Sequence, residues 1–209
     1  MNPYLSVGGN CVTEKTIEKS RFITSSRHVE GEEQAKAFVA EIASKYSDAT
    51  HNCFAYICDA LGNFMRFSDD GEPQGTAGMP ILEVIKNKKL MQTAVVVTRY
   101  FGGIKLGAGG LLRAYSGCAS ENLDRAVKVS FEVCSESLYR VEYSGAETAL
   151  RFFSDNGADI LETVYADGAM FRAAVRKSGE ENFNKSLIDR LNGRVSIEKL
   201  KEYYFPFRL

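Results

Sequence analysis

The sequence predicts an α+β protein of two domains, residues 1–128 and 129–209. Some segments are apolar at every second residue, whereas others are apolar at three- and four-residue steps, so strands and helices alternate along the chain. The pattern restarts after Val127, and the second domain then runs strand, helix, strand, strand, helix, strand. That order is the ferredoxin-like βαββαβ arrangement. No internal repeat interrupts either domain.

The N-terminal domain begins with strands. Residues 10–29 predict two strands that turn at Glu18–Lys19. Residues 31–47 follow as a helix, because their apolar positions recur at three- and four-residue steps. Residues 53–58 and 64–67 predict a hairpin, since the sequence DALGN between them has the chemistry of a turn.

Two helices and a buried strand complete this domain. Residues 76–89 predict a helix with Thr76 as its N-cap and lysines near its C-terminus. Residues 92–101, QTAVVVTRYF, form a continuous β-branched run that is typical of a strand covered on both faces. Residues 106–126 return to helical spacing and predict a second helix.

The C-terminal domain has the pattern of a split βαβ sandwich. Residues 127–144 predict a long strand or a strand pair, and residues 145–157 predict a helix. A hairpin over residues 158–178 and a helix over residues 180–193 follow, and residues 194–205 close the domain as a strand. No linker rich in proline, glycine or serine marks the boundary between the two domains.

Composition limits the classes of partner. A net charge of −1 and a pI of about 6.2 produce no overall field toward nucleic acid or anionic lipid, so such binding would need a local patch. The N-terminus lacks the pattern of a signal peptide, and Ala94–Val97 is far too short to span a membrane. Five cysteines without framework spacing favour free thiols. We therefore expect a cytoplasmic protein without a membrane partner.

A glycine-rich segment follows the buried strand but matches neither standard phosphate loop. Gly102 and Gly107 have the spacing of a Walker A loop, yet Ala108 and Gly109 stand where lysine and serine or threonine are required. The dinucleotide fingerprint fails at Leu112. A nucleotide-binding loop of either kind is therefore excluded.

The segment nevertheless has features of an anion site. A glycine-rich turn before a helix exposes backbone N–H groups and the positive end of the helix dipole. No acidic residue occurs between Val84 and Ser120, although that stretch holds six basic ones. The residues predicted to bind phosphate or RNA are Arg99, Tyr100, Phe101, Gly102, Gly103, Lys105, Gly107, Gly109, Gly110 and Arg113. The alternative is that the glycines only permit tight turns and close packing.

An acidic loop precedes the helix predicted over residues 76–89. Its candidate residues are Ser68, Asp69, Asp70, Gly71, Glu72, Pro73 and Thr76. Carboxylates so close together can ligate Mg²⁺ or Ca²⁺, but the spacing is not that of an EF-hand. The loop could also be a solvated Asp-Gly turn, or it could form ion pairs with the basic segment and hold the two loops side by side.

Histidines and cysteines do not form a recognisable centre. His51, Cys53 and Cys58 lie close in sequence, but their spacing fits no common zinc motif. The sequence has no G-x-S-x-G elbow and no cysteine in a reactive context. We therefore expect no catalytic residue, no metal site and no cofactor; the lack of a catalytic constellation favours a protein that is not an enzyme but leaves that question open.

Two segments together resemble a known family. The stretches FSDDGEPQGTAGMPIL and VVVTRYFGGIKLGAGGLLRAYSGCA closely resemble the two signature segments of the YigZ/IMPACT family. The resemblance covers about residues 15–126. It implies an N-terminal domain like the second domain of ribosomal protein S5. It also implies a ferredoxin-like C-terminal domain similar to the last domain of a translocating elongation factor.

The resemblance also suggests a role. Eukaryotic members of the family act in translational control through a partner that activates a stress kinase. Their partner-binding domain is not found in this sequence, so we do not expect that regulation here. The elongation-factor-like construction implies RNA or ribosome binding, and a protein partner in translation is possible.

Three functions therefore stay open. The first is a non-enzymatic protein associated with RNA or the ribosome, binding phosphates through the basic glycine-rich segment. The second is a small-molecule phosphate-ester or nucleotide site, perhaps in an enzyme, with Mg²⁺ held by Asp69, Asp70 or Glu72. The third is a protein-interaction module in which both loops only shape a docking face.

Overall fold

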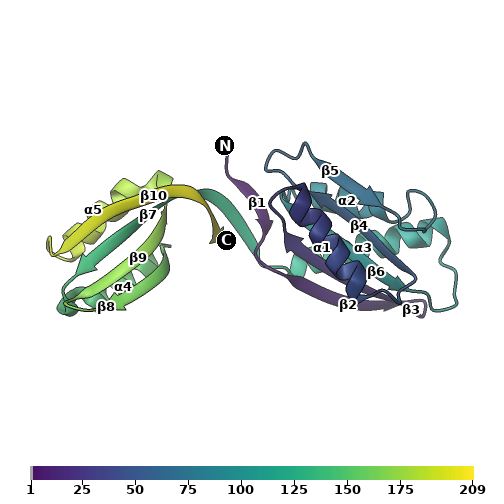
Figure 1. Ribbon diagram of the computed structural model, residues 1–209, viewed down its shortest axis with the longest axis horizontal. Helices are drawn as coiled ribbons and strands as arrows, with labels where there is room; N and C mark the ends of the chain where they lie inside the picture. Colours follow the sequence, from purple (N-terminus) through teal and green to yellow (C-terminus); the bar gives the residue numbers. More distant parts are fainter. Residues whose placement is uncertain (1) are drawn as a thin grey trace. The chain divides into compact units, whose positions relative to one another are not determined.

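A computed structural model describes residues 2–209 and divides them into two compact units (Figure 1). The N-terminal unit is built on Tyr4–Val129 and the C-terminal unit on Ser130–Phe207. Each unit has its own core, and the mixed α+β class predicted from the sequence is confirmed. Within residues 2–209, no helix is long and apolar enough to cross a membrane.

The N-terminal unit contains a five-stranded antiparallel sheet with the strand order β2-β3-β6-β4-β5. Its strands are β2 (Cys11–Ile17), β3 (Ser20–His28), β4 (His51–Ile57), β5 (Met65–Ser68) and β6 (Thr93–Tyr100). The β2–β3 hairpin turns at Glu18 and Lys19, as predicted, and both residues have positive φ. A two-residue turn of this kind matches the twist of the flanking strands.

Helices cover both faces of this sheet. Helix α1 (Glu32–Lys45) packs on one face, while α2 (Gly78–Asn87) and α3 (Gly107–Arg125) pack on the other (Figure 1). Strand β6 contributes alternate residues to the two cores, which explains its continuous apolar run. The predicted doubly covered strand is therefore confirmed.

Strand β1 (Tyr4–Val7) was not predicted from the sequence. Its Leu5 carbonyl accepts a hydrogen bond from Met91 N at 2.8 Å, and Gly8 N donates to the Val127 carbonyl at 2.7 Å. Four residues are too few to show a period in the sequence. The strand is held by bonds to chain segments more than 80 residues away.

The C-terminal unit is a ferredoxin-like sandwich, as the βαββαβ order predicts. Its strands are β7 (Lys128–Val141), β8 (Asp159–Tyr165), β9 (Ala169–Arg176) and β10 (Val195–Arg208). They take the order β10-β7-β9-β8. Helices α4 (Tyr143–Asp155) and α5 (Glu180–Arg190) bury Phe153, Phe183 and Leu187 in its core. Residues 127–144 thus contain one long strand rather than a pair.

His28 should make stability depend on pH. Its Nδ1 lies 2.8 Å from Ser6 Oγ at the end of β3, and burial lowers its pKa below 6.5 although nearby Glu30 acts to raise it. The unfolded chain therefore binds a proton more readily than the folded protein, so stability falls as the pH drops below about 6.5. Denaturant unfolding at pH 7.5 and 5.5 should show this loss.

A His28→Gln variant supplies the control for that measurement. Glutamine cannot titrate in this range, so the variant should lose less stability between the two pH values than the wild type. An equal loss in both proteins would show that other groups cause the pH dependence.

Candidate functional site

Asp69 organises the acidic loop by capping α2. Its Oδ1 accepts hydrogen bonds from Ala77 N at 3.0 Å and Gly78 N at 2.8 Å, and its Oδ2 accepts one from Gly75 N at 2.8 Å. Burial raises the pKa of Asp69, but these three N–H donors together lower it below its ordinary value. The carboxylate is thus held ionised at the positive end of the helix.

Thr76 is not the N-cap that the sequence suggested. Helix α2 begins at Gly78 with Ala77 before it, and no side chain of the adjoining residue caps it. The Thr76 hydroxyl instead donates to the Pro73 carbonyl at 2.6 Å. The prediction failed because Asp69, which lies eight residues before Ala77, accepts the hydrogen bonds from the backbone N–H groups of Ala77 and Gly78.

Asp70 and Gly71 form the turn of this loop. Both have positive φ, 43° and 84°. Asp70 Oδ2 accepts a hydrogen bond from Asn52 N at 2.5 Å, and the Asp70 carbonyl accepts one from His51 Nδ1 at 2.7 Å. Ser68 Oγ accepts from Asp70 N at 3.1 Å. The loop is therefore fastened to β4.

A buried ion pair joins the acidic loop to the basic segment. Arg99 Nη1 donates to Glu72 Oε1 at 2.6 Å, and the two side chains are only 5% and 4% exposed. Tyr115 also donates its hydroxyl to Glu72 Oε1 at 2.8 Å. His51 Nε2 lies 3.9 Å from the same oxygen. The sequence left three interpretations of the acidic loop open: a cation site, a solvated Asp-Gly turn, and ion pairs with the basic segment. The structure shows an ion pair with the basic segment.

Burial sets the protonation of the groups around this pair. It raises the pKa of Tyr115, with Cys53 and Glu72 adding to the effect, so the phenol keeps its proton and can donate. Burial likewise raises the pKa of Cys53 to about 12, and its thiol donates to the Asp69 carbonyl at 2.9 Å. Cys53 is therefore a packed thiol rather than a nucleophile.

The predicted role of Arg99 as an exposed phosphate contact needs correction. Its guanidinium is buried between Glu72 and Ser20, whose Oγ accepts from Nη2 at 3.2 Å. Tyr100 is also engaged, because its hydroxyl donates to Asp48 Oδ1 at 2.8 Å. Phe101, in contrast, is 46% exposed. A buried ion pair could not be foreseen from the charge pattern alone.

The glycines of the basic segment are subject to different physical constraints. A Cβ at Gly102 would lie 2.0 Å from the Lys19 carbonyl oxygen, so close packing requires this glycine. Gly103 and Gly107 have positive φ, 87° and 66°. A Cβ at Gly109 would meet nothing closer than 3.8 Å. Packing therefore explains Gly102, but it does not explain Gly109.

The N-terminus of α3 is uncapped and open. Leu106 precedes the helix, no side chain caps it, and its first turn contains no acidic residue. Gly107, Ala108 and Gly109 are exposed, as are Lys105 and Arg113. The backbone N–H groups of a first turn have no partner within the helix. This end of α3 therefore offers N–H donors and positive charge to an anion.

A cavity of about 320 Å³ connects the two loops with this helix end. The acidic loop contributes Glu72 and Pro73 to its lining, and the basic segment contributes Arg99, Phe101, Lys105 and Gly107. Leu106, Ala108 and Leu111 complete the wall. Gly110 and Arg113 line a neighbouring cavity that shares Lys105 and Leu106. These surroundings define the candidate site.

Sequence reasoning missed several residues of the site. Leu106, Ala108 and Leu111 line the cavity without having been predicted as site residues. Tyr115 and His51, which lie against Glu72, were not predicted either. The helical spacing around Tyr115 was visible in the sequence, but its hydroxyl contact with Glu72 was not. Several predicted residues, including Ser68, Asp69, Asp70, Gly71, Thr76 and Tyr100, support the loops and do not line the cavity.

The acidic loop does not gather a metal site. Asp69 and Asp70 accept hydrogen bonds from backbone N–H groups, and Glu72 accepts from Arg99 and Tyr115. Across residues 2–209, no group of three or more histidine, cysteine or acidic side chains is placed to hold a metal ion. The carboxylates of this loop therefore accept hydrogen bonds from groups of the protein itself.

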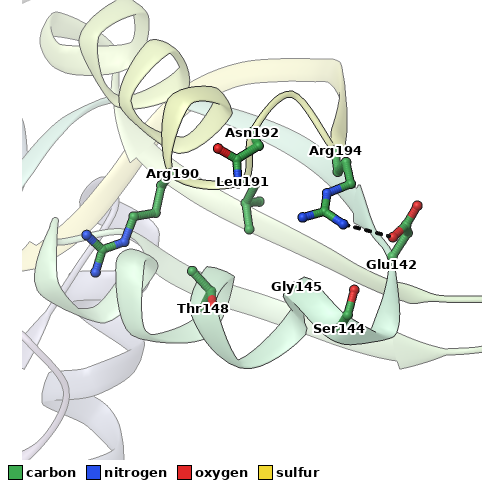
Figure 2. A pocket seen from close by; sticks show the side chains of 8 residues that line it. All are labelled: Glu142, Ser144, Gly145, Thr148, Arg190, Leu191, Asn192 and Arg194. Atoms are coloured by element: carbon green, nitrogen blue, oxygen red, sulfur yellow. Dashed lines mark ion pairs between the residues drawn. The ribbon is translucent and has the colours of Figure 1, made fainter.

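The C-terminal unit has a smaller cavity of about 220 Å³ (Figure 2). It lies between the beginning of α4, with Ser144 and Thr148, and the chain that follows α5. Arg194 Nη1 points toward Glu142 Oε2 at 3.9 Å. This cavity mixes both signs of charge and belongs to neither of the two segments singled out in the sequence.

Comparisons with known proteins agree with the division of the chain into an N-terminal and a C-terminal unit. Residues 18–123 match the Impact N-terminal domain, and residues 140–194 match a domain of unknown function (DUF1949). The chain is 36% identical over 204 residues to the IMPACT family member YvyE of Bacillus subtilis (strain 168), covering 95% of this chain and 92% of that protein.

Two further similarities span both units. The IMPACT family member YigZ of Escherichia coli (strain K12) is 31% identical over 204 residues, covering 97% of this chain and all of that protein. A crystal structure described as a hypothetical protein is 31% identical with a TM-score of 0.62, covering 96% and 98% of the two chains. The predicted resemblance is confirmed, and the chain belongs to the IMPACT family.

Proposed function

We propose that this protein binds RNA, holding its phosphates at the N-terminus of α3. The observation that carries this proposal is the uncapped first turn of α3, whose exposed Gly107, Ala108 and Gly109 lie between the exposed cations Lys105 and Arg113. Backbone N–H groups at a helix N-terminus favour a phosphate, and flanking cations add to the attraction. The site needs no metal and no reacting side chain.

The charge around the site supports an anionic partner. No acidic residue lies between Val84 and Ser120, and the one acidic side chain lining the cavity, Glu72, is paired with Arg99. The attraction is therefore local, although the whole chain carries a net charge of −1. Phe101, 46% exposed beside the cations, supplies a ring on which an unpaired base can stack.

A partner of this kind fits the role that membership of the IMPACT family suggests. We infer that the RNA belongs to the translation machinery, free or within the ribosome. The buried Arg99–Glu72 pair holds the site in shape and does not take part in the phosphate contact.

The double variant Lys105→Ala/Arg113→Ala tests the proposal. Fluorescence anisotropy with a labelled single-stranded RNA should show affinity reduced about tenfold or more at low salt. The slope of log K against log salt should fall in magnitude by about 1.4, because each lost phosphate contact removes about 0.7 for single strands. The melting temperature should stay close to that of the wild type, since both side chains are exposed.

A matched control is available on the opposite face of the same sheet. Lys36→Ala/Lys45→Ala removes the same charge from exposed positions of α1. This variant should keep the wild-type affinity and salt slope. Equal losses of RNA affinity in both double variants would show that the effect depends on net charge alone. The absence of RNA binding by the wild type at low salt would refute the proposal.

A further inference from the structure

The candidate cavity has a polar floor whose hydrogen bonds are incomplete. Glu72 Oε1 accepts from both Arg99 and Tyr115, whereas among residues 2–209 no donor is bonded to Glu72 Oε2. Arg99 Nε is buried, and within the described chain it has no acceptor. Both residues line the cavity. One buried donor of Arg99 and one oxygen of Glu72, both in residues that line the cavity, therefore have no hydrogen-bond partner within the described chain.

Such a combination is costly unless something completes it. A buried N–H without an acceptor typically costs free energy comparable to a lost hydrogen bond, and native proteins leave few of them. A ligand that carries both an acceptor and a donor on one edge would satisfy both groups together. The Watson–Crick edge of an unpaired nucleobase has this property, since on that edge each of the four RNA bases carries at least one hydrogen-bond donor and one acceptor.

The walls of the cavity suit a flat aromatic ring. Pro73, Leu106 and Leu111 are apolar, and the Phe101 ring lies within 5.4 Å of the Arg99 guanidinium. Phe101 is 46% exposed, so part of its ring is open to solvent. Base stacking on an aromatic side chain tolerates any of the four bases. A volume of about 320 Å³ also lies in the range of small-molecule sites.

The rim of the same cavity offers the phosphate contacts. Gly107 and Ala108 bring the first turn of α3 to it, and Lys105 adds a cation. Glu72, Arg99 and the first turn of α3 therefore line one space together with apolar residues. A ligand of matching chemistry has a base at one end and a phosphate at the other.

We infer that this cavity takes a single nucleotide, with its base against Glu72 and Arg99 and its phosphate at the N-terminus of α3. The inference deepens the proposed RNA binding and rests on it, since the same phosphate site serves both. The nucleotide is either the end of an RNA or a free nucleoside monophosphate. One donor and one acceptor on the floor predict little preference among the four bases.

Competition experiments distinguish the nucleotide from its parts. Adenosine, guanosine, cytidine and uridine 5′-monophosphates are each titrated against the complex with labelled RNA, beside ribose 5-phosphate and inorganic phosphate. We expect each nucleotide to compete at about 1 mM or below, with the two baseless anions at least about tenfold weaker. A 5′-phosphorylated RNA and the same RNA made circular separate a terminal nucleotide from an internal one.

Two variants test the cavity without breaking the buried ion pair. Phe101→Ala removes the stacking ring and should weaken nucleotide binding about tenfold. Ala108→Phe places a bulky side chain in the lining and should abolish competition by nucleotides. Their controls are Phe64→Ala, at a phenylalanine 69% exposed in the β4–β5 hairpin, and Leu112→Phe, at a leucine 48% exposed on α3 outside the lining. Neither control should change the affinity.

The outcomes separate this inference from the proposed function. If RNA binds but no nucleotide outcompetes ribose 5-phosphate, the nucleotide cavity is refuted while RNA binding stands. If calorimetric titration of the protein alone shows that nucleotides bind while RNA does not, the cavity is supported as a site for free nucleotides and the proposed function is refuted. If circular RNA competes as well as the linear form while free nucleotides also compete, an internal nucleotide occupies the cavity and the assignment to an RNA end is refuted. If neither ligand binds, both are overturned.

Discussion

Glu72→Ala is expected to lower the free energy of unfolding by about 3–5 kcal/mol, because it leaves the Arg99 charge buried without its partner. The two side chains are only 5% and 4% exposed and meet at 2.6 Å, so the remaining guanidinium stays largely buried. Tyr115 loses its acceptor as well. Urea unfolding followed by circular dichroism measures the change.

The double variant Glu72→Ala/Arg99→Ala shows whether the loss comes from the stranded charge. It should be destabilised by less than the sum of the two single variants, with a coupling of about 1–3 kcal/mol. Glu14→Ala is the matched control, since Glu14 pairs with Arg21 at 2.8 Å on the surface and its loss should change stability little. Simple additivity in the double variant would show that the pair is not a coupled unit.

Gly102→Ala is expected to destabilise the N-terminal unit by about 3 kcal/mol, the upper end of the usual cost of overpacking. The added Cβ would lie 2.0 Å from the Lys19 carbonyl oxygen and 2.6 Å from Ser20 N. Both atoms belong to the backbone of the β2–β3 hairpin, so the clash cannot be relieved by turning a side chain. Thermal unfolding should show a lower melting temperature.

Gly109→Ala is the matched substitution, seven residues along the same segment. Its Cβ would meet nothing closer than 3.8 Å, and alanine favours a helix more than glycine does. Stability should therefore stay the same or rise slightly. A loss at Gly109 as large as that at Gly102 would contradict the view that a close backbone approach distinguishes the two glycines.

Most of the secondary structure could be predicted from the sequence because its signals are local. The period of apolar residues marks α1, α3 and the ferredoxin-like order of the C-terminal unit, and Glu18–Lys19 marks the hairpin turn. Strand β1 escaped prediction because four residues carry no period. The cap of α2 escaped because its acceptor, Asp69, lies outside the positions where a cap is sought.

Both segments that line the candidate cavity were singled out in the sequence, but the contacts of their side chains were not foreseen. The acid-free stretch and the glycines pointed to the α3 N-terminus, where Lys105 and Arg113 are indeed exposed. Arg99 carries the same charge and lies in the same stretch, yet it is buried against Glu72. Charge counts treat these side chains alike, because they contain no information about which side chains become buried.

By itself, the sequence determined the α+β class, the order of most elements, the family, and the two segments that surround the site. Only the tertiary structure decided which charges of those segments face each other. Glu72 and Arg99 are 27 residues apart, and their pairing depends on where the loop between β5 and α2 lies against β6, which no local pattern encodes. The physical reason is that periodicity and turn chemistry act between neighbours in the chain, whereas burial and ion pairing act between neighbours in space.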